Sequence, residues 1–86
     1  MLKNVLVATH HTAFGELLRL SLEESGNYRV RIAQNAQEVL TTLKKQDFDL
    51  AIVDFELPDE PVASIVRAIR KQNPLFHVFR KQEQAD

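Results

Sequence analysis

The 86-residue sequence contains no cysteine, no long apolar run and no large excess of charge of either sign. The lack of cysteine excludes disulfide bonds and thiolate chemistry and fits a reducing compartment, so we expect a cytoplasmic protein. No apolar run approaches the roughly 18 residues of a membrane span, and residues 1–5 do not form the long apolar region of a signal peptide. The formal net charge is only −1, so we expect neither a nucleic acid nor a membrane surface as a partner.

Apolar residues nevertheless make up 44% of the sequence, which places it well above the range of disordered chains. The length suits one small domain with a real but limited core. Four short segments with strand-like patterns, at 5–8, 28–32, 50–53 and 75–79, alternate with three segments of helical periodicity. This alternation predicts a parallel sheet with right-handed crossovers.

The predicted strands differ in their side-chain pattern. Residues 5–8 and 50–53 are continuous apolar runs, which are typical of strands buried on both faces of a parallel sheet. Residues 28–32 alternate strictly between polar and apolar side chains, which predicts a half-exposed strand near a sheet edge. We therefore expect the central, buried strand residues to be Val5, Leu6, Val7, Ile52 and Val53.

Three amphipathic helices are predicted between these strands. The first ends at Gly26, which tolerates left-handed backbone angles, and its expected buried stripe is Phe14, Leu17, Leu18, Ser21 and Leu22. The second begins after Asn35, with Glu38 three residues further on as in a capping box, and its expected stripe is Ala36, Val39, Leu40 and Leu43. The third is expected to be capped by Asp59 or Glu60 and to bury Val62, Ile65, Val66 and Ile69.

Asp54 stands directly after the apolar run 50–53 and before a loop that contains Pro58 and three acidic residues. In open α/β sheets, ligands bind at the carboxyl ends of the strands, which makes Asp54 the first candidate for a functional carboxylate. The alternative is that Asp54 only terminates the strand. Its position alone leaves both interpretations open.

Three features of the chain stand in a characteristic order and spacing. A strand and a helix span residues 5–22, the segment Asp47-Phe48-Asp49-Leu50 leads into the third strand, and Asp54 is followed by Glu56-Leu57-Pro58. In these features the chain resembles the receiver domain of two-component response regulators over about residues 3–80. The resemblance implies a flavodoxin-like, three-layer α/β/α fold whose parallel sheet is truncated to about four strands in the order 2-1-3-4. It implies a receiver-like domain over residues 1–80 and a polar tail over 81–86.

The resemblance also implies a functional site around Asp54, as the phospho-acceptor candidate. In the family a histidine kinase supplies the phosphate, and Mg²⁺ is held by an acidic pair after the first strand, by the acceptor aspartate, and by a backbone carbonyl that corresponds here to Glu56. Thr9 and His10 occupy the acidic-pair positions in this sequence, and imidazole suits Zn, Cu or Ni rather than Mg²⁺. We therefore expect Mg²⁺ to bind weakly or not at all, with Asp54 and the Glu56 carbonyl as its remaining metal ligands, and no other cofactor.

A second metal arrangement stays open at the same place, because His10 and His11 follow Thr9 at the end of the first strand. They could hold a metal ion together with Asp54. Adjacent histidines, however, are expected to point in different directions, which favours a solvated pair of side chains.

These residues imply a degenerate, shortened receiver: a pseudo-receiver in two-component signalling that acts through protein–protein contacts. Two alternatives stay open, namely a phospho-accepting response regulator receiver that uses Asp54 and a structural or assembly domain that dimerises through its open sheet. We expect no enzymatic activity, because the sequence has no Gly-rich phosphate loop and no nucleophile–base pair. The expected partner is a signalling protein such as a histidine kinase.

A homodimer is expected as well. The chain ends after the fourth predicted strand, whereas a full receiver continues through a further helix, strand and helix. The strand at 76–79 would then offer an unpaired edge, and the sheet face beside the first helix would stay open. A two-fold dimer is the commonest way to cover such surfaces.

Overall fold

The computed structural model of the protein describes residues 2–54, 57–59, 61–72 and 77–80. Strands and helices alternate along the chain in the predicted order. They are β1 (Lys3–Ala8), α1 (Thr12–Glu24), β2 (Tyr28–Ala33), α2 (Ala36–Lys45), β3 (Leu50–Val53), α3 (Val62–Gln72) and β4 (His77–Arg80). The predicted tail at 81–86 and Glu56, Glu60 and residues 73–76 lie outside the described residues.

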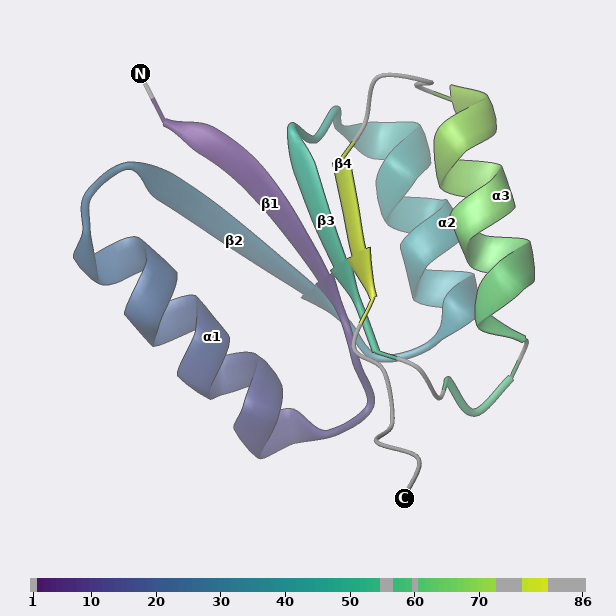
Figure 1. Ribbon diagram of the computed structural model, residues 1–86, viewed down its shortest axis with the longest axis horizontal. Helices are drawn as coiled ribbons and strands as arrows, with labels where there is room; N and C mark the ends of the chain where they lie inside the picture. Colours follow the sequence, from purple (N-terminus) through teal and green to yellow (C-terminus); the bar gives the residue numbers. More distant parts are fainter. Residues whose placement is uncertain (1, 55–56, 60, 73–76, 81–86) are drawn as a thin grey trace.

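All strand pairs of the described sheet are parallel, and the strand order is β2-β1-β3-β4, as predicted. Figure 1 shows α1 on one face of this sheet and α2 and α3 together on the other, which confirms the expected three layers. The register aligns Ala8 of β1 with Val53 of β3, so these two neighbouring strands end at the same edge of the sheet. No helix in the described part of the chain is long and apolar enough to cross a membrane.

The larger core lies between the sheet and the helices α2 and α3. It is formed by apolar residues of β1 and β3 and of the two helices, among them Leu6, Ala51, Val53, Val39, Leu43, Ile65 and Ile69. A smaller core lies under α1, where Val5, Val7 and Val30 are buried and Leu18 and Leu22 pack against them. Four of the five predicted central residues are fully buried, whereas Ile52, on the α1 face, is only partly buried.

The predicted buried stripe of α1 is partly wrong. Leu17 is 63% exposed and Ser21 is exposed, while the helix buries Gly15 and turns Leu18 and Leu22 toward the sheet. The reason is a close approach at Gly15, where an added Cβ would lie 3.2 Å from the Thr9 methyl carbon and 3.4 Å from Ile32 Cδ1. The helix therefore rests on the sheet through its glycine, and the stripe that contains Leu17 is rotated toward solvent.

Of the two residues predicted to cap the third helix, Glu60 lies outside the described residues, and the carboxylate of Asp59 caps α2 instead. Its Oδ1 accepts a hydrogen bond from the Ala36 N–H at 2.7 Å and its Oδ2 accepts one from the Gln37 N–H at 3.1 Å. Asn35 caps the same helix in the predicted way, because its side chain accepts a bond from the Glu38 N–H at 2.8 Å. The first N–H groups of a helix have no partner within it, and the loop after β3 supplies a carboxylate for two of them.

Candidate functional site

Thr9 and Asp54 lie next to each other at the carboxyl ends of the two central strands of the sheet. Thr9 follows β1 and its N–H donates to the Ala33 carbonyl at 2.9 Å, while Asp54 follows β3 and its N–H donates to the Ala8 carbonyl at 2.8 Å. These backbone bonds continue the two ladders by one residue beyond the strands. Both side chains are buried, with Thr9 1% and Asp54 3% exposed. The structure therefore places a buried carboxylate at the strand end where the sequence predicted one.

The Thr9 hydroxyl is the direct neighbour of the Asp54 carboxylate. It donates a hydrogen bond of 2.7 Å to Oδ2 of Asp54 and accepts one of 3.1 Å from the His11 N–H. A hydroxyl has one donor and two acceptor sites, so the same group can serve both partners. The bond fixes the carboxylate in orientation and links it to the chain that follows β1.

Gly15 of α1 lies against the side chain of Thr9. The Thr9 methyl carbon lies 3.2 Å from where a Cβ at residue 15 would stand, closer than most side-chain contacts. A side chain at residue 15 would require the Thr9 methyl group or the helix to shift by a few tenths of an ångström. Gly15 is therefore a supporting residue of the site, and helical periodicity alone did not reveal it.

The two histidines lie beside Asp54, and the expectation that they point apart is wrong. The ring centroids of His10 and His11 are 4.1 Å apart, with an angle of 37° between the ring planes. His11 Nε2 lies 3.8 Å from Oδ2 of Asp54, and one ligand atom from each of the three residues lies within 4.8 Å of the others. Side chains alternate along a straight strand, but the chain bends at His10, and this bend brings both rings to the same side.

Among the described residues, the donor set around Asp54 does not fit Mg²⁺. This ion requires octahedral coordination by hard oxygen atoms, usually with carboxylates and water. The described residues offer one carboxylate, one hydroxyl that is already bonded to it, and two imidazoles. The predicted carbonyl ligand, that of Glu56, lies outside the described residues. The role predicted for Asp54 and Glu56 as weak Mg²⁺ ligands stays a prediction.

The loop beyond Asp54 is tied to α2 through Asp59. The two backbone N–H bonds from Ala36 and Gln37 lower the pKa of the Asp59 carboxyl below its ordinary value of 3.8, and the bond from Ala36 has the larger effect. The ionised carboxylate also lies at the positive end of the α2 dipole, which favours its charge. Residues 57–59 are thus anchored over the same edge of the sheet as Asp54.

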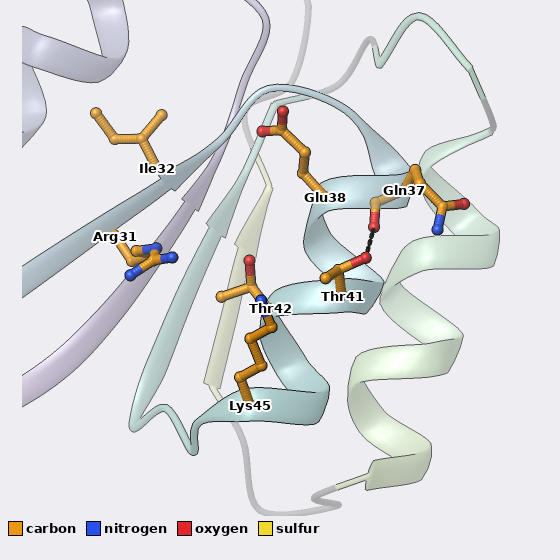
Figure 2. Close-up of a pocket in the computed structure, with 7 residues that line it drawn as sticks. All are labelled: Arg31, Ile32, Gln37, Glu38, Thr41, Thr42 and Lys45. Atoms are coloured by element: carbon orange, nitrogen blue, oxygen red, sulfur yellow. Dashed lines mark hydrogen bonds between the residues drawn. The ribbon is translucent and has the colours of Figure 1, made fainter.

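A separate hollow lies between β2 and α2, away from these residues. It has a volume of about 240 Å³ and is lined by Arg31, Ile32, Gln37, Glu38, Thr41, Thr42 and Lys45. Figure 2 shows that its wall along α2 includes the Thr41 hydroxyl, which donates to the Gln37 carbonyl at 2.9 Å. Neither Thr9, Asp54 nor the two histidines line it, so we place the candidate site at the carboxyl ends of β1 and β3 and not in this hollow.

Comparison with known proteins gives a consistent result. A family model described as the response regulator receiver domain matches residues 5–80. The chain is 32% identical over 76 residues to the DNA-binding transcriptional regulator NtrC of Bradyrhizobium sp. (strain RP501 Parasponia), a match that covers 88% of this chain and 16% of that protein. The chain thus spans only a small part of this curated relative.

Solved receiver structures resemble the fold closely. The response regulator TrrA of Thermotoga maritima, in complex with Mg²⁺-BeF, superimposes with a TM-score of 0.81 at 30% identity, over 90% of this chain and 66% of its own. A response regulator of Burkholderia pseudomallei, solved with a phosphorylated aspartic acid, a calcium ion and citrate, gives a TM-score of 0.88 at 27% identity, over 98% of this chain and 49% of its own.

Proposed function

The chain belongs to the response regulator receiver domain family of two-component signalling, and on that premise we propose that it is a pseudo-receiver, which acts through protein–protein contacts without Mg²⁺-dependent phosphorylation of Asp54. One observation carries the proposal: the Thr9 hydroxyl donates to Oδ2 of Asp54 at 2.7 Å, at a position where the family resemblance implies a carboxylate. The hydroxyl brings no negative charge of its own, so it does not supply the second carboxylate that would attract Mg²⁺.

The electrostatic argument supports the same conclusion. Transfer of a phosphoryl group to a buried carboxylate accumulates negative charge, and a divalent cation normally stabilises that charge. The described residues around Asp54 contribute a hydroxyl and two imidazoles, which do not attract Mg²⁺ as an acidic pair does. A hydrogen bond from Thr9 also stabilises the resting carboxylate and makes its oxygen a weaker nucleophile.

The second candidate function is a phospho-accepting receiver. It is favoured by the position of Asp54 itself, at the end of a central strand and 3% exposed. The comparison with the Burkholderia pseudomallei regulator, which was solved with a phosphorylated aspartic acid, points in the same direction. The two candidates differ in one measurable property, the formation of an aspartyl phosphate.

The remaining parts of the proposal concern partners. A receiver-like module without chemistry of its own needs a protein to contact, and we propose a histidine kinase or another signalling protein in this role. We also propose that the chain has no enzymatic activity and makes no direct contact with nucleic acid or a membrane. A structural role with a homodimer is the third candidate, and its support among the described residues is the exposure of Leu17 and Leu20 on α1, at 63% and 61%. A cytoplasmic location stays a prediction.

Incubation with acetyl phosphate and Mg²⁺, followed by intact-mass spectrometry, tests the proposal. We expect no phosphorylated form of this chain under conditions that modify a receiver able to bind Mg²⁺-BeF, such as TrrA of Thermotoga maritima. The matched variant Thr9→Asp/His10→Asp restores two carboxylates beside Asp54 and is expected to gain modification, which Asp54→Asn then removes. Full modification of the unaltered chain on Asp54 would establish the phospho-accepting alternative instead.

A further inference from the structure

We propose that His10, His11 and Asp54 form a binding site for a divalent transition-metal ion of the Zn²⁺ class. The site lies where the family resemblance implies Mg²⁺, an ion that the described ligand atoms do not suit. The inference does not depend on whether Asp54 is ever phosphorylated. It rests on the positions of three side chains, on their chemistry, and on the groups that hold the carboxylate.

The geometry comes first. In a tetrahedral Zn²⁺ site, metal–ligand distances of roughly 2.0–2.2 Å place neighbouring ligand atoms about 3.3–3.6 Å from one another. The distance from His11 Nε2 to Asp54 Oδ2 is 3.8 Å, and one ligand atom from each of the three residues lies within 4.8 Å of the others. The group is therefore close to coordination distance, and small rotations of the imidazole rings complete the approach.

Both histidines lie on the solvent side of the carboxylate. The side chain of His11 is 49% exposed and His10 is exposed, whereas the side chain of Asp54 is 3% exposed. The carboxylate is thus a fixed ligand at the base of the site, and two adjustable ligands stand at its opening. An ion entering from solvent meets the histidines first, and a fourth position is left for water or for a group from a partner protein.

The chemistry of the donors selects the ion. Two imidazoles and one carboxylate form a borderline donor set, which suits Zn²⁺, Ni²⁺ and Cu²⁺ and disfavours Mg²⁺ and Ca²⁺. Two histidines and one carboxylate also match the three-ligand pattern of known open zinc sites. An ion at this position places positive charge beside a buried carboxylate.

The surrounding hydrogen bonds prepare the carboxylate for this role. Thr9 donates to Oδ2 of Asp54 at 2.7 Å, and an ionised carboxylate has about four acceptor positions, so coordination does not require this bond to break. Hydrogen bonds of this kind orient metal-bound carboxylates. The His11 N–H donates to the same hydroxyl at 3.1 Å, which fixes the backbone of one histidine relative to the carboxylate.

Isothermal titration of the tag-free 86-residue chain with ZnCl₂ tests the site. We expect one Zn²⁺ per chain, and we expect His10→Gln, His11→Gln and Asp54→Asn each to weaken binding by at least about tenfold, the lower limit for loss of even an outer-shell partner. His77→Gln is the matched control, because His77 pairs in register with Leu50, at the opposite end of β3 from Asp54, and should bind Zn²⁺ like the unaltered chain. A large excess of MgCl₂ should not displace the ion.

Titration of the unaltered chain by NMR keeps the test independent of how the variants fold. Zn²⁺ should shift the ring signals of His10 and His11 and the side-chain carboxyl signal of Asp54, and it should leave the ring signals of His77 in place. The proposal is overturned by the absence of binding, by Zn²⁺ shifts confined to the histidines, or by binding that Asp54→Asn leaves unchanged, since each of these describes something other than the three-residue site. A failed phosphorylation proposal would appear in the mass spectrum and would leave this titration unaffected.

Discussion

Thr9 and Asp54 are 45 residues apart in sequence, and their side chains form a buried hydrogen bond of 2.7 Å between the ends of two neighbouring strands. The bond joins the hydroxyl of a residue that is 1% exposed to a carboxylate that is 3% exposed. In a buried setting, the loss of one partner leaves the other to bear its desolvation cost, so the pair matters for stability as well as for the site.

The first prediction concerns this hydroxyl. Thr9→Val keeps the shape of the side chain but removes the donor to Asp54 and the acceptor for the His11 N–H, so we expect a loss of about 1–3 kcal/mol in the free energy of unfolding. Urea denaturation followed by circular dichroism measures the change. Thr9→Ser retains the hydroxyl and serves as the control, with a smaller loss. Equal stability of the valine variant and the unaltered chain would contradict the prediction.

The second prediction concerns Gly15, whose substitution has two opposing effects. Alanine favours a helix interior by about 1 kcal/mol over glycine. Its Cβ would, however, meet the Thr9 methyl carbon at 3.2 Å, whereas Ile32 atoms at 3.4 and 3.5 Å allow ordinary contact. We expect Gly15→Ala to stabilise the Thr9→Ser variant, which lacks that methyl group, by up to about 1 kcal/mol, and to stabilise the unaltered chain by less. Urea denaturation of the four proteins decides this, and identical effects in both backgrounds would show that the contact is unimportant.

The fold was predictable because the strand patterns are physically distinct. Continuous apolar runs identified β1 and β3 as the central strands, and the alternation in β2 identified an edge strand, as the strand order confirms. The stripe of α1 was less predictable. Helical spacing allows two adjacent stripes on this helix, and the choice between them depends on the close approach of Gly15 to Thr9, which is a tertiary contact.

The site was predictable only in part. The positions of Asp54 and Thr9 could be predicted because each residue stands directly after a strand. Their side chains lie close together because these two strands pair in parallel and end at the same edge of the sheet. The side-by-side arrangement of His10 and His11 depends on a backbone bend, which a rule about adjacent side chains does not anticipate. The available signal was the occurrence of two adjacent histidines one residue beyond the end of a buried strand.

The third prediction concerns a homodimer, which the sequence predicts through the fourth strand and the open sheet face and for which α1 offers a further surface. Leu17 and Leu20 are three residues apart on α1 and are 63% and 61% exposed, so they form one apolar surface on the described part of the chain. If a second copy covers this surface, Leu17→Lys should shift the chain toward the monomer by placing a charge in the contact. Sedimentation equilibrium at micromolar concentration measures this. Leu2→Lys, at an exposed leucine before β1, is the matched control, and a monomeric unaltered chain would reject the dimer.

The last prediction concerns Asp59 and the dependence of stability on pH. Its carboxyl has a pKa below the ordinary value of 3.8 in the folded chain, chiefly because the Ala36 N–H donates to the ionised form. A lowered folded pKa means that the unfolded chain binds the proton more readily. The stabilisation is therefore fully present above the unfolded pKa and is lost as the pH falls through the folded pKa.

Asp59→Asn tests this relationship, because an amide oxygen can accept one N–H bond but cannot ionise in this range. We expect the unaltered chain to have a higher urea midpoint than the variant at about pH 5 and above, and we expect the difference to shrink as the pH is lowered toward about pH 3. Asp47→Asn, at an exposed carboxylate after α2, controls for the general loss of a negative charge. A difference between the unaltered chain and Asp59→Asn that stays constant across this range would show that the charge of Asp59 does not contribute, and that hydrogen bonding alone ties residues 57–59 to the start of α2.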